Sequence, residues 1–164
     1  MKTSIILLSA LLASSSMALP YTSLERRETS EQIVFNSINT WIGDVNTVNE
    51  FVDNPSLDPN VALASAQNEP NQLQILSSFN LDANGQNAAN VLREVFGNVV
   101  TALEDIVNDP NGPGVQVDLQ EINNVRCLDV LPAVTTLWAS AASAVGAPPP
   151  PAANVPSVCS TVSG

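Results

Sequence analysis

Apolar residues recur at helical spacing along most of this chain, and this periodicity limits the fold more than any other feature. In residues 29–53 they repeat three and four positions apart, which places them on one stripe of a helix. Thr29 and Gln32 are typical of a capping box, and Asn54-Pro55 predicts the helix end, because a residue before proline avoids the α region. The stripe consists of Val34, Ile38, Trp41, Val45, Val48 and Val52.

Two further stripes follow, and turn-forming residues separate them. Asp58-Pro59 is typical of a helix start, and Pro70 either kinks this second helix or begins a new one. After a turn at residues 82–85, a third helix is expected over about 86–108. Its apolar face contains Ala88, Leu92, Val95, Phe96, Val99, Leu103 and Ile106.

The last part of the helical region is interrupted by one proline. Residues 109–114 form a Pro- and Gly-rich break, and residues 115–131 then predict a fourth helix. Pro132 either kinks that helix or opens a fifth, which Gly146 would close as a C-cap residue. No segment alternates as a strand does. The sequence therefore predicts an all-α fold, a compact bundle of about five amphipathic helices over residues 28–146.

The N-terminus has the features of a secretory leader. Lys2 precedes an apolar run that is too short to span a bilayer, and small residues end at Ala18, so residues 1–18 are expected to be a signal peptide. Residues 19–27 then resemble a pro-segment, because the dibasic pair Arg26-Arg27 is what secretory processing proteases recognise. We expect the mature protein to begin near Glu28, to be secreted, and to contain no transmembrane segment.

The charge of the chain excludes some partners. It has 5 Lys and Arg residues against 16 Asp and Glu residues, and only Arg93 and Arg126 among the basic residues lie after position 27. Binding a nucleic acid needs a basic face that displaces counterions, and two arginines cannot supply one. Anionic membrane surfaces are disfavoured for the same reason. The acidic surface suits solubility, and it would also attract a cationic partner.

The two cysteines and the Pro-rich tail at residues 147–164 belong to one prediction. In an oxidising compartment Cys127 and Cys159 should form a single disulfide, worth about 3–4 kcal/mol in the chain-entropy model. It would pin the tail to the bundle. The run Pro148–Pro151 should be extended polyproline helix. It is either a stiff spacer or a ligand for a proline-binding domain, and the spacer is favoured because such domains are mostly intracellular.

The inventory of reactive groups argues against catalysis and against a metal site. The chain has no His, and no Lys lies after position 27, so the usual bases and zinc ligands are missing. Residues 80–85 resemble a calcium loop only weakly, and a helix-capping turn is the better interpretation. Carboxylates that could act in pairs are expected on solvated helix faces; they are Glu94, Glu104, Asp105 and Asp129. We expect no enzymatic activity and no cofactor.

Both tryptophans lie on apolar stripes, where aromatic side chains usually belong to the core. They could also line a ligand cavity between the helices of a bundle. If such a cavity exists, its expected lining is Trp41, Val45, Leu92, Phe96, Leu137 and Trp138.

Two segments carry a resemblance to known proteins. Residues 39–46 (NTWIGDVN) and 123–132 (NNVRCLDVLP) look like segments of small secreted fungal proteins. In its order of helices, the chain resembles the fungal hydrophobic-surface-binding and cell-wall mannoprotein family. The cysteine pair is a departure from that family's usual domains. The resemblance implies a helical bundle that binds lipids or adsorbs to hydrophobic surfaces, and it supplies no catalytic residues.

Together these observations predict a secreted, non-enzymatic binding protein for a fatty acid, another apolar ligand or a hydrophobic surface. The alternative is a secreted cell-wall or host-interaction protein that uses its acidic surface and has no small-molecule ligand. A hydrolase that uses paired carboxylates is the third and least supported hypothesis.

Overall fold

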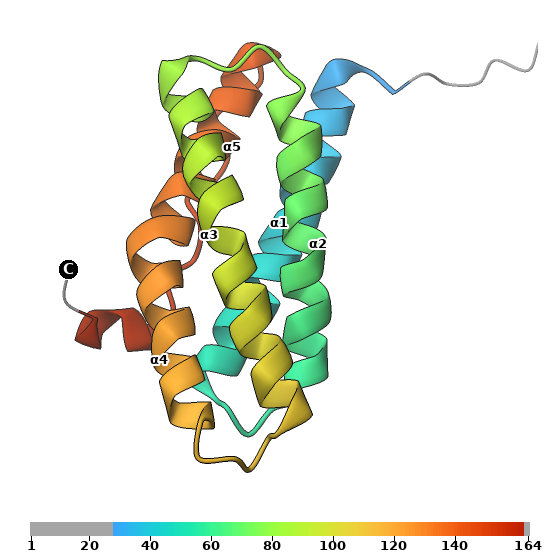
Figure 1. The fold of residues 1–164 in the computed structure, drawn as a ribbon. Helices are drawn as coiled ribbons and strands as arrows, with labels where there is room; N and C mark the ends of the chain where they lie inside the picture. Colours follow the sequence, from blue (N-terminus) through green and yellow to red (C-terminus); the bar gives the residue numbers. More distant parts are fainter. Residues whose placement is uncertain (1–27, 163–164) are drawn as a thin grey trace, which may run out of the picture.

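The computed structural model describes residues 28–162 as an antiparallel helical bundle (Figure 1). No strand occurs within these residues, which confirms the all-α prediction, whereas the predicted leader at 1–27 lies outside them. The elements are α1 (Ser30–Asp53), α2 (Pro59–Ser77), α3 (Ala83–Asn108), α4 (Val115–Val125), the π-helical segment η1 (Arg126–Val130), α5 (Leu131–Ala144) and the 3₁₀ turn η2 (Ser157–Thr161).

The described residues contain four long helices, so the expectation of about five was wrong. Because α4, η1 and α5 follow one another without a break, they form one helix of 30 residues, Val115–Ala144. The Leu131 N–H donates to the Arg126 carbonyl, five residues back, which is the hydrogen bond of a π-helix. Pro132 is accommodated in the first turn of α5, immediately after this wider turn. Pro70 does not begin a new helix either, because it lies inside the continuous helix α2.

The ends of the helices follow the local signals closely. The capping box of Thr29 and Gln32 is present, and Asp58 caps α2. Helix α3 begins at Ala83, earlier than the expected position 86, because the Asp82 carboxylate accepts the Gly85 N–H at 2.8 Å. Gly146 ends α5 with a φ of 74°, a left-handed conformation that glycine adopts without strain.

Consecutive helices run in opposite directions, and each packs against its neighbours around one core. Helix α1 packs on α2, α2 on α3, α3 on the α4–α5 rod, and α5 returns to α1 (Figure 1). The core is built from the predicted stripes, which supply Trp41 from α1, Leu92 and Phe96 from α3, and Leu137 and Trp138 from α5. This up-down-up-down arrangement is the simplest form of a four-helix bundle.

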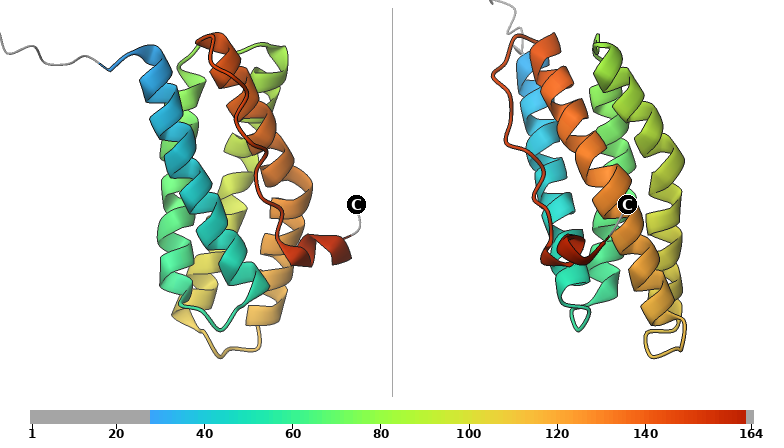
Figure 2. Two further views of the ribbon diagram at one scale, coloured as in Figure 1. Left: turned by 180° about the vertical axis from the view of Figure 1, so that it is seen from behind. Right: turned by 90° about the vertical axis from the view of Figure 1, so that its left-hand side faces the viewer.

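After α5 the chain turns back and runs alongside α1 and α5 toward the other end of the bundle (Figure 2). Residues 147–156 have no helical or strand structure, and η2 follows beside the lower end of α1 and beside α4. The disulfide Cys127–Cys159, with the two Cα atoms 5.4 Å apart, joins η2 to η1 and confirms the predicted pairing. The tail is therefore a fixed part of the fold.

The 30-residue rod is long and apolar enough to cross a membrane by length and composition alone. Half of its most apolar window is nevertheless buried against the other helices. A core helix of a bundle has the same composition, so this helix does not indicate a membrane span.

Candidate functional site

The six residues predicted to line a ligand cavity lie together at the centre of the bundle. Each is at most 5% exposed. The Trp41 ring lies between two other aromatic rings, with centroid distances of 6.0 Å to Phe96 and 6.1 Å to Trp138. Val45 and Trp138 border a hollow of about 70 Å³ beneath the tail. Trp41, Leu92 and Leu137 are side chains of the packed core, so their role toward a ligand stays a prediction.

A buried ion pair lies beside this aromatic cluster. Arg126 Nη1 donates to Glu69 Oε1 at 2.9 Å, and both side chains are almost completely buried. The other carboxylate oxygen of Glu69 accepts the Trp41 Nε1–H at 3.0 Å. Arg126 Nη2 donates to Asn49 Oδ1 at 3.0 Å and to the Val45 carbonyl at 3.3 Å. This network joins α1, α2 and the π-segment, and the sequence analysis did not predict it.

A signal for the ion pair exists in the sequence. Glu69 occupies a stripe position of α2, since it lies three residues after Ala66 and four before Leu73, both of which are buried. Arg126 likewise lies four residues after the buried Ile122. A charged residue on the apolar stripe of a helix must find an opposite charge inside the core, because an unpaired buried charge is too costly.

A groove lies between α1 and the Pro-rich tail, and we call it the tail groove. Its volume is about 820 Å³, within the range of small-molecule sites. Apolar side chains from both walls predominate: Val34, Phe35, Ile38 and Ile42 from α1, Ala142 from α5, and Ala147 with Pro148–Pro151 from the tail. Phe35 stands at the rim with 64% of its surface exposed.

The polar groups of the tail groove are mostly uncharged. Thr29, Gln32 and Asn39 supply hydroxyl and amide groups, and Glu31 is the one charged residue of the lining. Among the described residues of this lining, all within 28–162, none is a cation. The groove therefore suits a ligand with a long apolar body and a neutral polar end better than one with an anionic end.

The tail that forms one wall of the groove is held in place at several points. The Ala153 N–H donates to Thr135 Oγ1 on α5 at 3.0 Å. Asn154 donates through its amide to Asn46 at 2.7 Å, and its carbonyl accepts from Asn49 at 2.8 Å. Because Asn49 also accepts from Arg126, the buried ion pair and the tail share one hydrogen-bonded network.

The end of the tail is fastened by a carboxylate. Asp53, the last residue of α1, accepts the Ser157 N–H at 3.0 Å, the Ser157 hydroxyl at 2.8 Å and the Val158 N–H at 3.1 Å. The Ser157 backbone hydrogen bond is the main cause that lowers the pKa of Asp53 below its ordinary value. The Cys127–Cys159 disulfide closes the same corner covalently.

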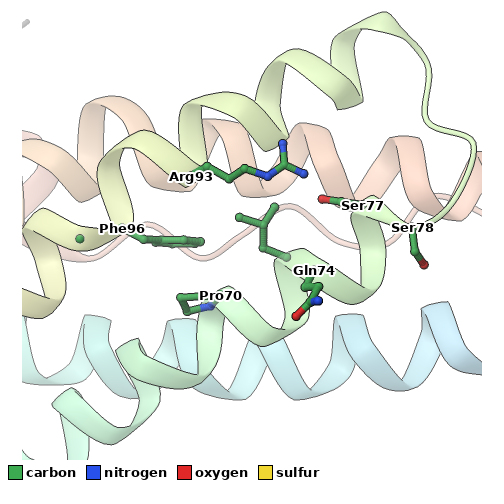
Figure 3. Close-up of a pocket in the computed structure, with 8 residues that line it drawn as sticks. Pro70, Gln74, Ser77, Ser78, Arg93 and Phe96 are labelled. Carbon is green, nitrogen blue, oxygen red and sulfur yellow. The ribbon is translucent and has the colours of Figure 1, made fainter.

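A second hollow, of about 460 Å³, lies between α2 and α3 (Figure 3). Leu73 and Phe96 are its buried apolar residues, and Arg93 stands at its edge. Phe96 is the one predicted lining residue that faces this hollow. We call it the Arg93 cleft. The remaining lining residues are Pro70, Gln74, Ser77, Ser78 and Gly97.

The carboxylates considered for hydrolysis line neither the tail groove nor the Arg93 cleft. They are all exposed on helix surfaces, at Glu94, Glu104, Asp105 and Asp129. Within residues 28–162, no group of three or more His, Cys, Asp or Glu side chains could hold a metal ion.

No family model, curated protein or solved structure matches this chain.

Proposed function

We propose that this chain is a secreted, non-enzymatic binding protein that holds a ligand in the tail groove. The ligand has a long apolar body and a neutral polar end, as a lipid or a protonated fatty acid does. The observation that carries the proposal is the groove itself, about 820 Å³ of mainly apolar space with an exposed phenylalanine at its rim. The predicted leader and the disulfide support secretion, because disulfides persist in oxidising compartments.

The construction of the groove favours binding. Four consecutive prolines form much of one wall, and proline loses little conformational freedom when a ligand binds because its φ is already fixed. The other wall is formed mainly by apolar side chains of α1. Each methylene group of a ligand that leaves water by packing against it contributes about 0.8 kcal/mol. Ten such groups contribute about 8 kcal/mol, which corresponds to a Kd on the order of 1 μM before ordering costs.

A fluorescence titration with the neutral apolar dye Nile red tests the proposal, using Phe35→Gln as the variant. Phe35 is exposed, so its replacement should leave the fold intact while removing apolar contact from the groove. We expect the wild-type protein to bind the dye and mono-olein to displace it. We expect binding to Phe35→Gln to be about five- to thirtyfold weaker, from the loss of about 1–2 kcal/mol of apolar contact.

Val117→Gln is the matched control. Val117 on α4 is 65% exposed, nearly the same as Phe35, but it lies outside the tail groove. Its replacement should leave the affinity for Nile red unchanged. Equal weakening by both substitutions, or no binding by the wild-type protein, would contradict the proposal.

The acidic surface favours a second candidate, a cell-wall or host-interaction protein without a small-molecule ligand. Of the acidic residues in 28–162, Glu69 is the one that forms an ion pair, and most of the others are exposed. This alternative predicts salt-sensitive retention on cell-wall extract by a protein that carries no lipid and that binds no Nile red.

A further inference from the structure

Arg93 is the only cation on the surface of residues 28–162. The other arginine of this part of the chain, Arg126, is buried and paired with Glu69. Arg93 donates to Asn90 Oδ1 at 2.8 Å and forms no ion pair with any described residue. On the acidic surface of residues 28–162, this exposed guanidinium attracts an anion at short range.

This cation stands over an apolar hollow. Pro70 of α2 faces Phe96 of α3 across the Arg93 cleft (Figure 3), and Leu73 of α2 also lines it. Gly97 lines the hollow, and a Cβ atom built there meets nothing within 4 Å, so a larger side chain has room at this position. An apolar group of moderate size can therefore enter between the two helices beside the guanidinium.

A second polar group points into the same place. The Ser77 hydroxyl oxygen is buried and has no hydrogen-bond partner among the described residues. Figure 3 shows this hydroxyl and the Arg93 guanidinium turned toward each other along the cleft. Buried polar atoms in native proteins nearly always have a partner, so a ligand oxygen that the serine hydroxyl reaches by rotating its side chain would satisfy the serine as well as the arginine.

We propose that the Arg93 cleft is a second binding site, which takes a small carboxylic acid with an apolar body in its ionised form. The carboxylate would accept hydrogen bonds from the Arg93 guanidinium and the Ser77 hydroxyl, and the apolar body would pack on Leu73 and Phe96. Charge distinguishes this site from the tail groove, where none of the lining residues that the structure describes is a cation. The inference does not depend on the function proposed for the tail groove.

Isothermal titration of the whole protein with octanoate, and with octanol as the uncharged analogue, tests this site. The Arg93→Gln variant removes the charge, and Gly97→Leu fills the hollow while leaving Arg93 in place. We expect the Kd of octanoate to rise about two- to fivefold in Arg93→Gln, since an exposed ion pair contributes no more than that. Gly97→Leu should abolish octanoate binding at the cleft.

Two controls separate this site from the rest of the molecule. Gly43 on α1 is also an exposed helical glycine with nothing within 4 Å of a Cβ atom, so Gly43→Leu should fold equally well and bind octanoate as the wild type does. Phe35→Gln, which perturbs the tail groove, should also leave octanoate binding at the cleft unchanged. Octanoate affinity that is insensitive to both Arg93→Gln and Gly97→Leu, or that falls only in Phe35→Gln, would overturn the inference.

Discussion

At the scale of single residues, the most consequential feature is the pairing of Glu69 with Arg126 in the core. A buried ion pair is weak evidence of stability, because desolvation offsets much of the attraction. It does fix geometry, since the pair joins α2 to the π-segment and, through Trp41 and Asn49, to α1. The pair therefore sets the register in which three parts of the bundle meet.

Arg126→Met is expected to lower the free energy of unfolding by about 3–5 kcal/mol, because it leaves the Glu69 carboxylate buried without its counter-ion. The double variant Arg126→Met/Glu69→Gln should be more stable than Arg126→Met alone, since glutamine is neutral and its carbonyl oxygen can still accept from Trp41. Urea denaturation followed by far-UV circular dichroism measures both.

Arg93→Met serves as the control, because Arg93 is exposed and its replacement should change stability by no more than about 0.5 kcal/mol. If Arg126→Met lowered the free energy of unfolding no more than Arg93→Met, Arg126 would not be needed to neutralise the buried charge of Glu69. A double variant no more stable than Arg126→Met would contradict the same claim.

At the scale of elements, the sequence predicted where helices begin and end far better than it predicted which helical segments continue into one another. Caps and breaks are local, so the signals at Thr29, Asp58 and Gly146 were sufficient to place helix ends. The number of helices was wrong because a proline such as Pro132 can be accommodated beside a π-segment, and no local pattern reports that. The tail's path was also hidden, because it depends on contacts more than a hundred residues apart, such as Asn49 with Asn154.

The attachment of the tail to Asp53 should depend on pH. The folded pKa of Asp53 is below its ordinary value of 3.8, so its hydrogen bonds to Ser157 and Val158 are fully present above that pH. They are lost as the pH falls through the lower, folded pKa. In an NMR titration, we expect the amide proton signals of Ser157 and Val158 to move upfield with a midpoint below 3.8.

Asp53→Asn should remove this titration of the two amide signals, while the disulfide keeps the end of the tail close to η1. Amide signals that do not titrate, or that titrate with a midpoint above the ordinary aspartate value, would show that the carboxylate does not hold the tail.

At the scale of the whole molecule, the bundle and its tail together make a surface that neither would make alone. The six residues that the helix stripes predicted as the lining of a ligand cavity lie in the packed core, because stripe positions face inward toward other stripes. The tail groove instead combines the stripe residues Val34 and Ile38 with rim positions such as Phe35. Its other wall contains prolines that the sequence indicated as a spacer or as a ligand for a proline-binding domain. The groove could not have been predicted without knowing where the tail runs.

The tail groove lies at the surface, whereas the cavity predicted from the sequence lay in the core, and the expected mode of binding differs accordingly. A ligand in the tail groove needs no opening of the core, because one wall is the tail and the rim is already exposed to solvent. Binding should therefore leave the environment of Trp41, which is sealed within the bundle, unchanged.

Native mass spectrometry of the protein purified from culture medium tests the central claim most directly. We expect the wild-type protein to begin near Glu28 and to carry one apolar molecule that organic extraction removes, with markedly lower occupancy in Phe35→Gln than in Val117→Gln. A wild-type protein that has the bare polypeptide mass, and that stays bare after incubation with mono-olein, would contradict the claim.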